Sequence, residues 1–316
     1  MLRLCTNRIL VLSALAVIGC TAARTNQDPA VMAESKAVAF LQREVPAWSR
    51  ENHCFSCHNN GDAARALYAA GRKGHRVPAR VLADTTAWVD RPAGWDENKG
   101  DPGFSDKRLA NIQFAASLLA AVEAGRVNDG AALKEAARKV AADQVADGSW
   151  PIDKGNAVGS PATYGTTLAT YMALRTIKAA AVSGTEAVIQ KAEDWLHLVK
   201  PDTVFAAAVL LQASAPNETT SLDLIRRTQT SDGGWGPYPD SPPETFDTAL
   251  VLLALQRMRE EAGVNGMVQR GRAFLWSQQE ADGGWPATTR PSGASSYAQR
   301  ISTTGWATLA LLATRN

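Results

Sequence analysis

Long apolar runs rich in small residues alternate along this chain with amphipathic segments. The runs 166–174, 247–255 and 303–311 each begin with a polar residue and continue almost without charge. A polar first residue is typical of a helix cap, and a nearly continuous apolar run indicates a helix that is buried on most sides. We therefore expect these three segments to be inner helices, each preceded by a more amphipathic outer helix.

A seven-residue motif separates each outer helix from the inner helix that follows it. It reads Gln-x-x-Asp-Gly-[Gly/Ser]-Trp and occurs at 144–150, 229–235 and 279–285. The Asp-Gly pair is a helix-ending turn signal, so each motif is predicted to close an outer helix. The recurring polar and aromatic residues are Gln144, Trp150, Gln229, Trp235, Gln279 and Trp285.

Weaker copies of the same pair of helices fill the rest of the chain. They pair 35–43 with 62–71, 81–90 with 109–123, and 187–199 with 204–213. Each hairpin exposes apolar surface that only a neighbouring hairpin can cover, as repeat architectures require. The pattern predicts an all-α fold, a single α/α toroid of about six helical hairpins that spans residues 35–316.

The C-terminal motif carries a family resemblance. Arg270-Gly271, Phe274-Leu275, Gln279 and Gly283-x-Trp285 resemble the Gln-Trp repeat of squalene-hopene and oxidosqualene cyclases, whose toroids are similar to protein prenyltransferase β subunits. The resemblance covers roughly residues 35 to 314 and is strongest in the last third. It implies a structural role for the six Gln and Trp residues, which tie successive repeats together, and an apolar-lined cavity inside the ring.

The reactions of that family are not implied, because their catalytic motifs are missing. The chain has no Asp-x-Asp-Asp acid, no Cys after residue 57 for a prenyltransferase zinc site, and no Gly-Cys-Gly-Glu-Gln thioester sequence. Glu244 and Asp247 precede an inner helix, but Asp247 is expected to cap it. A terpenoid cyclase or a zinc-dependent transferase is therefore the least favoured function.

The N-terminus has the features of an export signal. Arg3 and Arg8 precede the apolar run 9–19, which is too short to span a bilayer, and Val17-Ile18-Gly19-Cys20 resembles a bacterial lipobox. We expect residues 1–19 to be a signal peptide, Cys20 to be lipidated and residues 20–34 to form a flexible tether. The alternative is an ordinary signal cleaved near Ala22-Ala23. The lipobox predicts a periplasmic protein of the bacterial cell envelope, anchored to a membrane, with the outer membrane favoured.

Charge then limits the partners of the exported chain. Lys and Arg total 33 and Asp and Glu total 31. Removal of Arg3 and Arg8 leaves a neutral chain, which does not favour nucleic acid as a partner.

One motif carries chemistry outside the repeat pattern. Cys54-Phe55-Ser56-Cys57-His58 is the Cys-x-x-Cys-His attachment sequence of c-type haem, and it contains both thiols of the mature chain apart from Cys20. Two thiols at this spacing reach both vinyl groups of one porphyrin, and His58 then coordinates the haem iron. The segment also resembles one found in bacterial exported proteins with squalene-cyclase-type repeats. Alignment of the inner helices places His58 at the ring mouth, where haem c would lie over the central cavity.

Other uses of these residues stay open. Cys54 and Cys57 can form a disulfide, or bind zinc with two of His53, His58 and His75. For haem, His75 is the first candidate for the sixth ligand and Met32 the second. Open coordination would permit redox catalysis, as in a haem-dependent oxidoreductase, whereas two protein ligands would favour electron transfer to a redox partner.

Two functions from different classes follow. The first is electron transfer or redox chemistry by a haem at the ring mouth, and the second is a non-catalytic toroid that binds a hydrophobic ligand or a protein. The sequence does not decide whether the chain is an enzyme. Aromatic residues in loops beside the inner helices are candidates for the mouth: Trp95, Tyr164, Tyr238 and Tyr297.

Overall fold

The computed structural model describes residues 29–99, 106–128, 130–152, 158–216, 218–290 and 296–315, which form helices and no strand. The predicted signal peptide and Cys20 lie outside the described residues. None of the helices in these ranges is both long enough and apolar enough to cross a bilayer.

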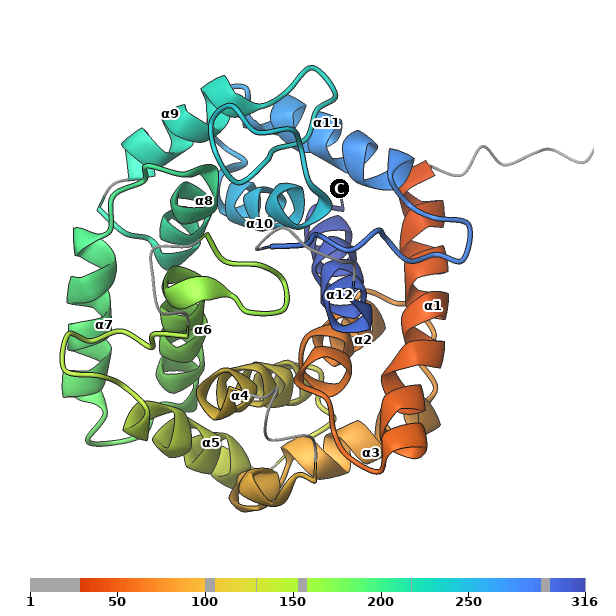
Figure 1. Ribbon diagram of the computed structural model, residues 1–316, viewed down its shortest axis with the longest axis vertical. Helices are drawn as coiled ribbons and strands as arrows, with labels where there is room; N and C mark the ends of the chain where they lie inside the picture. Colours follow the sequence, from red (N-terminus) through yellow and green to blue (C-terminus); the bar gives the residue numbers. More distant parts are fainter. Residues whose placement is uncertain are drawn as a thin grey trace, which may run out of the picture.

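Twelve α-helices of the described chain form two concentric rings (Figure 1). The outer helices are α1 (Pro29–Asn52), α3 (Ala79–Val89), α5 (Gly130–Ala142), α7 (Glu186–Leu198), α9 (Glu218–Thr228) and α11 (Val264–Ser277). The inner helices are α2 (Ala64–Arg72), α4 (Lys107–Glu123), α6 (Gly165–Ala180), α8 (Val204–Ala213), α10 (Thr245–Leu255) and α12 (Tyr297–Ala313). Three short helical turns, η1 (Cys57–Ala63), η2 (Pro92–Glu97) and η3 (Gln256–Met258), complete the described elements.

The inner ring is closed. Each inner helix packs against the next one, and α12 packs against α2 and η1, so the last hairpin contacts the first. The outer helix α1 likewise contacts α11 and α12. The prediction of an α/α toroid of six helical hairpins is therefore confirmed.

Burial follows the predicted division into inner and outer helices. Residues 204–211 of α8 are all buried, because neighbouring inner helices and an outer helix surround them. The outer helix α7 buries only Ala192 and Leu196, one helical turn apart on the same face. The hydrophobic core is therefore formed mainly by the six inner helices around the axis of the ring.

The motif Trp side chains hold the end of each outer helix. Each indole is fully buried, and its N–H donates to the carbonyl ten residues earlier. These bonds join Trp150 to Val140 at 2.7 Å, Trp235 to Ile225 at 2.8 Å, and Trp285 to Leu275 at 2.7 Å. The backbone N–H of each Trp donates to a Thr hydroxyl on the next inner helix, Thr170, Thr248 or Thr304. One Trp residue thus joins both helices of a hairpin, through its indole to the outer helix and through its backbone N–H to the inner helix.

The motif Gln residues connect one hairpin to another. Each amide donates to its own turn and to a carbonyl on a later or earlier outer helix. Gln144 reaches Val188 on α7 at 2.9 Å, Gln229 reaches Met267 on α11 at 3.0 Å, and Gln279 reaches Ala33 on α1 at 2.9 Å. The third bond closes the ring between its two ends.

The start of α1 corrects the expected tether. Residues 29–34, which the sequence assigned to a flexible segment, form the first turns of this helix. Glu34 is fully buried, and its carboxylate pairs with Arg272 at 3.3 Å and with Arg315. Two guanidiniums from the other end of the chain therefore hold this segment in the ring. The local composition of residues 29–34 could not predict these long-range ion pairs.

Candidate functional site

The Cys-x-x-Cys-His segment lies at the start of the first inner helix. Cys57 and His58 begin η1, which continues directly into α2. Ser56 caps this turn, since its hydroxyl accepts from the backbone N–H groups of His58 at 3.1 Å and Asn59 at 3.4 Å. The short polar residue between the two thiols therefore sets the direction in which His58 leaves the backbone.

The His58 imidazole is held through one of its two nitrogens. Nδ1 forms a hydrogen bond of 3.1 Å with the hydroxyl of Ser302 on α12, and Nε2 has no partner among the described residues. Burial lowers the pKa of His58 to about 4, so the ring is neutral near pH 7. A neutral imidazole with Nδ1 bonded and Nε2 unengaged has the form that metal-ligating histidines take.

The two thiols are free. Cys54 is buried and Cys57 is partly buried, and no disulfide joins them in this structure. Phe55 between them stacks on Trp88, with ring centroids 4.5 Å apart, which fixes the loop against α3. Burial, with a smaller contribution from Asp62, raises the pKa of the Cys57 thiol to about 12. The donor set, two unpaired thiols and one oriented imidazole, fits a covalently attached haem.

His75 lies away from this segment. It follows α2, and its Nε2 lies 3.5 Å from the Glu34 carboxylate and also contacts Arg315. All of η1 and α2 separate it from His58, roughly 20 Å at the rise of a helix. The arrangement therefore does not bring His75 to the iron of a haem that His58 holds. Met32, two residues before Glu34 on α1, is exposed on that same remote side.

The same separation bears on the zinc alternative. Within the described ranges, no three His, Cys, Asp or Glu side chains come together as a group that could hold a metal ion. His75, one of the three histidine candidates for zinc, contacts Glu34 on the far side, which leaves His53 and His58 as the candidates beside Cys54 and Cys57. A haem needs only His58 from the protein and is compatible with this arrangement.

A network of buried polar side chains is centred on Asp62, four residues after His58 in η1. Asp62 is 1% exposed, and its carboxylate pairs with Arg65 at 3.2 Å and accepts hydrogen bonds from Gln113 at 3.0 Å and from the Tyr164 hydroxyl. Burial raises the pKa of Asp62, while Arg65 opposes the shift. The guanidinium of Arg65 also lies over the Trp306 ring, 4.5 Å from its centroid. The network thus spans four inner segments around the axis of the ring.

Sequence reasoning missed this network. Asp62, Arg65, Gln113 and Ser302 all interrupt inner-helix segments that are otherwise apolar or small. Polar residues inside a run that periodicity assigns to the core were the available signal, since a buried polar group must be paired. Which of them pair depends on ring closure, which brings α12 beside η1.

The four aromatic residues expected at the mouth divide into two pairs. Tyr164 and Trp95 are buried, and Trp95 donates to the carbonyl of Trp88 at 3.2 Å. Tyr238 and Tyr297 are exposed. The Tyr297 hydroxyl accepts from the Asn59 amide at 3.0 Å, next to His58, and donates to Glu44 at 2.9 Å. Only Tyr297 is therefore linked to the Cys-x-x-Cys-His segment from an exposed position.

Asp247 does not cap α10, contrary to the expectation. The cap position is Glu244, and Asp247 lies in the first turn of the helix. Its buried carboxylate binds both terminal nitrogens of Arg290, at 2.6 and 3.3 Å, and Arg290 also bonds Glu244 at 3.1 Å. Arg290 further donates to the carbonyl of Gly159. Through Arg290, the two acids connect the start of α10 with the loops that precede α6 and α12. A structural role in this bidentate ion pair accounts for the acid at Asp247.

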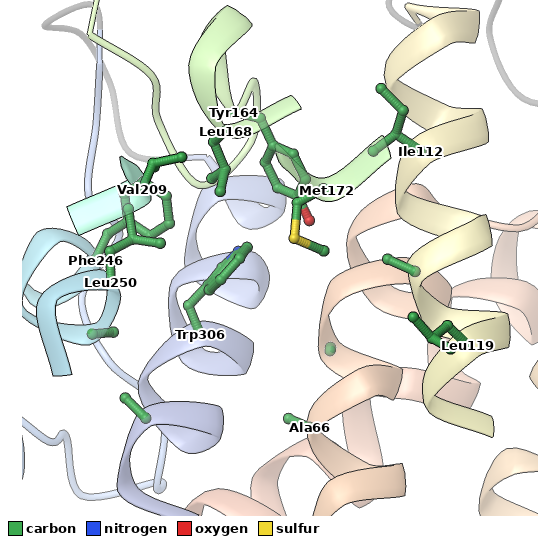
Figure 2. Close-up of a cluster of buried hydrophobic side chains, with 14 of the residues drawn as sticks. Ala66, Ile112, Leu119, Tyr164, Leu168, Met172, Val209, Phe246, Leu250 and Trp306 are labelled. Carbon is green, nitrogen blue, oxygen red and sulfur yellow. The ribbon is translucent and has the colours of Figure 1, made fainter. Parts of the chain in front are cut away.

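A central cavity of about 460 Å³ lies on the other side of the buried network. All six inner helices or their C-terminal ends line it, with Arg65 and Trp306 on its inner wall. Figure 2 shows Met172 and Trp306 converging with Tyr164 near the centre of the ring. The cavity rim is formed at the C-terminal ends of the helices, whereas His58 lies at an N-terminal end. The Cys-x-x-Cys-His segment and the central cavity therefore lie on opposite sides of Asp62 and Arg65. A haem held by His58 would not lie over this cavity, contrary to the expectation.

Comparison with known proteins supports the predicted family. Residues 205–316 match the model of the squalene-hopene cyclase C-terminal domain. A segment of 68 residues is 37% identical to a squalene–hopene cyclase of Bradyrhizobium diazoefficiens, and it covers 20% of this chain and 10% of that relative. The predicted resemblance to squalene-hopene cyclases is therefore confirmed for the C-terminal part of the chain, and the match spans only a tenth of the curated relative's length.

Solved structures extend the likeness to nearly the whole ring. The type II terpene cyclase MstE from Scytonema, in complex with geranylgeranyl dihydroxybenzoate, superposes with a TM-score of 0.58 over 90% of this chain and 97% of that chain, at 12% identity. The ligand-free form of MstE gives 0.55, over 90% of this chain and 98% of that chain, at 13% identity. At such identity the likeness shows the α/α toroid fold alone.

Proposed function

We propose that this chain is a lipid-anchored protein of the bacterial cell envelope that carries a c-type haem on its toroid and transfers electrons or performs redox chemistry. The observation that carries the proposal is the geometry of His58. Its Nδ1 is bonded to Ser302, its Nε2 is without a described partner, and two unpaired thiols precede it at the haem-attachment spacing.

Each residue of the segment has a distinct task. Cys54 and Cys57 would form the two thioethers, and His58 would coordinate iron through Nε2. A bound haem supplies one-electron chemistry at a potential set by its ligands and surroundings. Ser302 orients the imidazole, and the stack of Phe55 on Trp88 holds the intervening loop.

Covalent attachment can be tested directly. The full chain would be produced in a host that matures cytochromes c, and a reduced pyridine haemochrome spectrum and the protein mass would be recorded. We expect a covalent haem that is lost in Cys57→Ser and in Cys54→Ser. His53→Gln is the matched control, because His53 is exposed one residue before the motif and should leave attachment intact. A colourless protein with two alkylatable thiols or a disulfide would contradict the proposal.

The lipid anchor rests on the lipobox at residues 17–20 and needs a separate test. We expect the mature chain to begin at an acylated Cys20, to incorporate labelled palmitate and to fractionate with membranes. Cys20→Ser should abolish both the label and the fractionation. Release of the wild-type chain into the soluble periplasmic fraction after cleavage near Ala22 would contradict the anchor.

Ligand binding inside the ring is a second candidate function, and the central cavity favours it. A volume of about 460 Å³ lies within the range of small-molecule sites, and its lining combines apolar side chains with basic ones. This function does not require haem, because the cavity and the Cys-x-x-Cys-His segment lie on opposite sides of the buried network. Binding of a medium-chain amphiphile to the purified protein tests it.

A further inference from the structure

We propose that the central cavity binds a single-chain amphiphile with an anionic head, which sits at the rim while the apolar chain lies inside. The inference deepens the second proposed function, ligand binding in the ring, and does not depend on haem. It is carried by the contrast between the wall of the cavity and its rim.

Apolar side chains from helices on several sides of the ring line the cavity, together with the polar residues Tyr171, Gln212 and Gln256. Its apolar residues include Ala69, Met172, Leu253, Trp306, Leu309 and Leu312. The one ionised group on the inner wall, Arg65, is paired with Asp62 at 3.2 Å on its other side. The wall therefore offers a hydrocarbon chain burial against apolar side chains without an unpaired charge at its inner end.

The rim has the opposite character. Four basic residues, Arg72, Lys73, Arg175 and Arg257, line the cavity together with a single acid, Glu123. Four positive charges and one negative charge leave an excess of three positive charges there. Nearby, Glu218 approaches Arg257 only to 3.8 Å. A head group with negative charge is the chemistry that complements this rim.

Arg72 and Arg175 are the most specific part of the rim. They come from α2 and α6 and bind the two oxygens of the same carboxylate, Glu123 on α4, at 2.8 and 3.0 Å. Their side chains are 50% and 38% exposed, and the described bonds engage one nitrogen of each guanidinium. A guanidinium has five N–H donors, so both retain donors for a second anion beside Glu123.

The C-terminal ends of the inner helices reduce the positive charge of the rim. Inner helices end at the rim, and the partial negative charge of their carbonyls offsets part of the basic excess. Arg257 is partly used in this way, since it donates to the carbonyl of Leu211. Arg72 and Arg175 instead pair with a side chain and extend into solvent. The prediction therefore depends on these two arginines rather than on the total charge.

The test compares ligands that share a chain and differ in the head. Binding of dodecanoate, dodecyl phosphate and dodecanol to the full-length protein would be measured by titration calorimetry below their micelle concentrations. We expect at least one anionic ligand to bind about tenfold more tightly than dodecanol, the effect of a charge-assisted hydrogen bond. The better of the two anions identifies the head as a carboxylate or a phosphate.

Variants then locate the effect. Arg72→Gln with Arg175→Gln should remove the anionic preference and leave dodecanol affinity unchanged, whereas Glu123→Gln should strengthen anion binding. Arg226→Gln is the matched control, because Arg226 pairs with an acid on the outer helix α9 and does not line the cavity. Equal affinity for dodecanol and both anions would overturn this inference alone, and no binding of any of the three would overturn ligand binding in the ring as well.

Discussion

Gln279 donates a hydrogen bond of 2.9 Å to the carbonyl of Ala33, 246 residues earlier in the chain. The same amide nitrogen also donates to the carbonyl of Gly283 at 2.9 Å. Gln144 and Gln229 make the equivalent pair of bonds between repeats that lie closer together in sequence. The motif Gln therefore has two structural roles. Gln144 and Gln229 join consecutive outer helices, whereas Gln279 joins the last outer helix to the first and closes the ring.

Removing this closing bond should loosen the first outer helix. Gln279→Ala removes the two hydrogen bonds that the amide donates to the carbonyls of Ala33 and Gly283, and we expect a loss of about 1–3 kcal/mol in the free energy of unfolding. Urea unfolding measures that loss, and hydrogen exchange of α1 locates it. Gln144→Ala, the matched control, loses the equivalent two bonds, so it should cost a similar amount but leave exchange in α1 unchanged. Equal exchange in α1 for both variants would show that Gln279 has no special part in closure.

Gly283 should tolerate no side chain. Its φ is +96°, and a Cβ would lie 2.4 Å from the carbonyl oxygen of Lys36, on the rigid first helix. Gly283→Ala is therefore expected to cost about 4 kcal/mol or more in the free energy of unfolding, in the upper range for single substitutions. Gly184→Ala, with a φ of +87° and no atom within 4 Å of the added Cβ, should cost only about 1–2 kcal/mol. Similar thermal unfolding of the two variants would refute the close approach of motif and helix.

Asp62 should make stability depend on pH. Burial raises its pKa above the ordinary value of 3.8, so the folded protein holds the proton up to a higher pH than the unfolded chain does. The unfolded chain releases this proton first as pH rises. The contribution of Asp62 to stability is therefore greatest below its unfolded pKa and declines as pH rises through the folded pKa.

The comparison with Asp62→Asn isolates this dependence. Asn resembles the neutral acid, so the stability of the parent relative to the variant, measured by urea unfolding, should fall as the pH rises above 3.8, the ordinary pKa. Asp202→Asn, at an exposed position, corrects for the loss of one carboxylate from the chain. A relative stability that rises with pH would mean that Arg65 outweighs the desolvation of Asp62.

The parts of this fold that repeat could be predicted from the sequence. The three Gln-Trp motifs and the small, apolar helices that follow them led to six hairpins and a ring. The candidate site was harder to predict from the sequence, because its residues occur once each and come together only when the ring closes. His58 was visible as part of a local motif, but its partner Ser302 is 244 residues away. The contact of His75 with Arg315, 240 residues away, was hidden for the same reason.

Ser302 should tune a haem held by His58 without touching the iron. Its hydroxyl accepts from Nδ1–H in the tautomer that leaves Nε2 available, and this bond increases the electron donation of the imidazole. Ser302→Ala removes the acceptor, so we expect a higher reduction potential with the haem still covalently attached. Ser302→Thr retains a hydroxyl and should restore the lower potential. In the haem-free protein, loss of the bond should increase exchange of the Nδ1 proton in NMR spectra. An unchanged potential together with an unchanged proton exchange rate would mean that Ser302 only packs against His58 and does not position its ring.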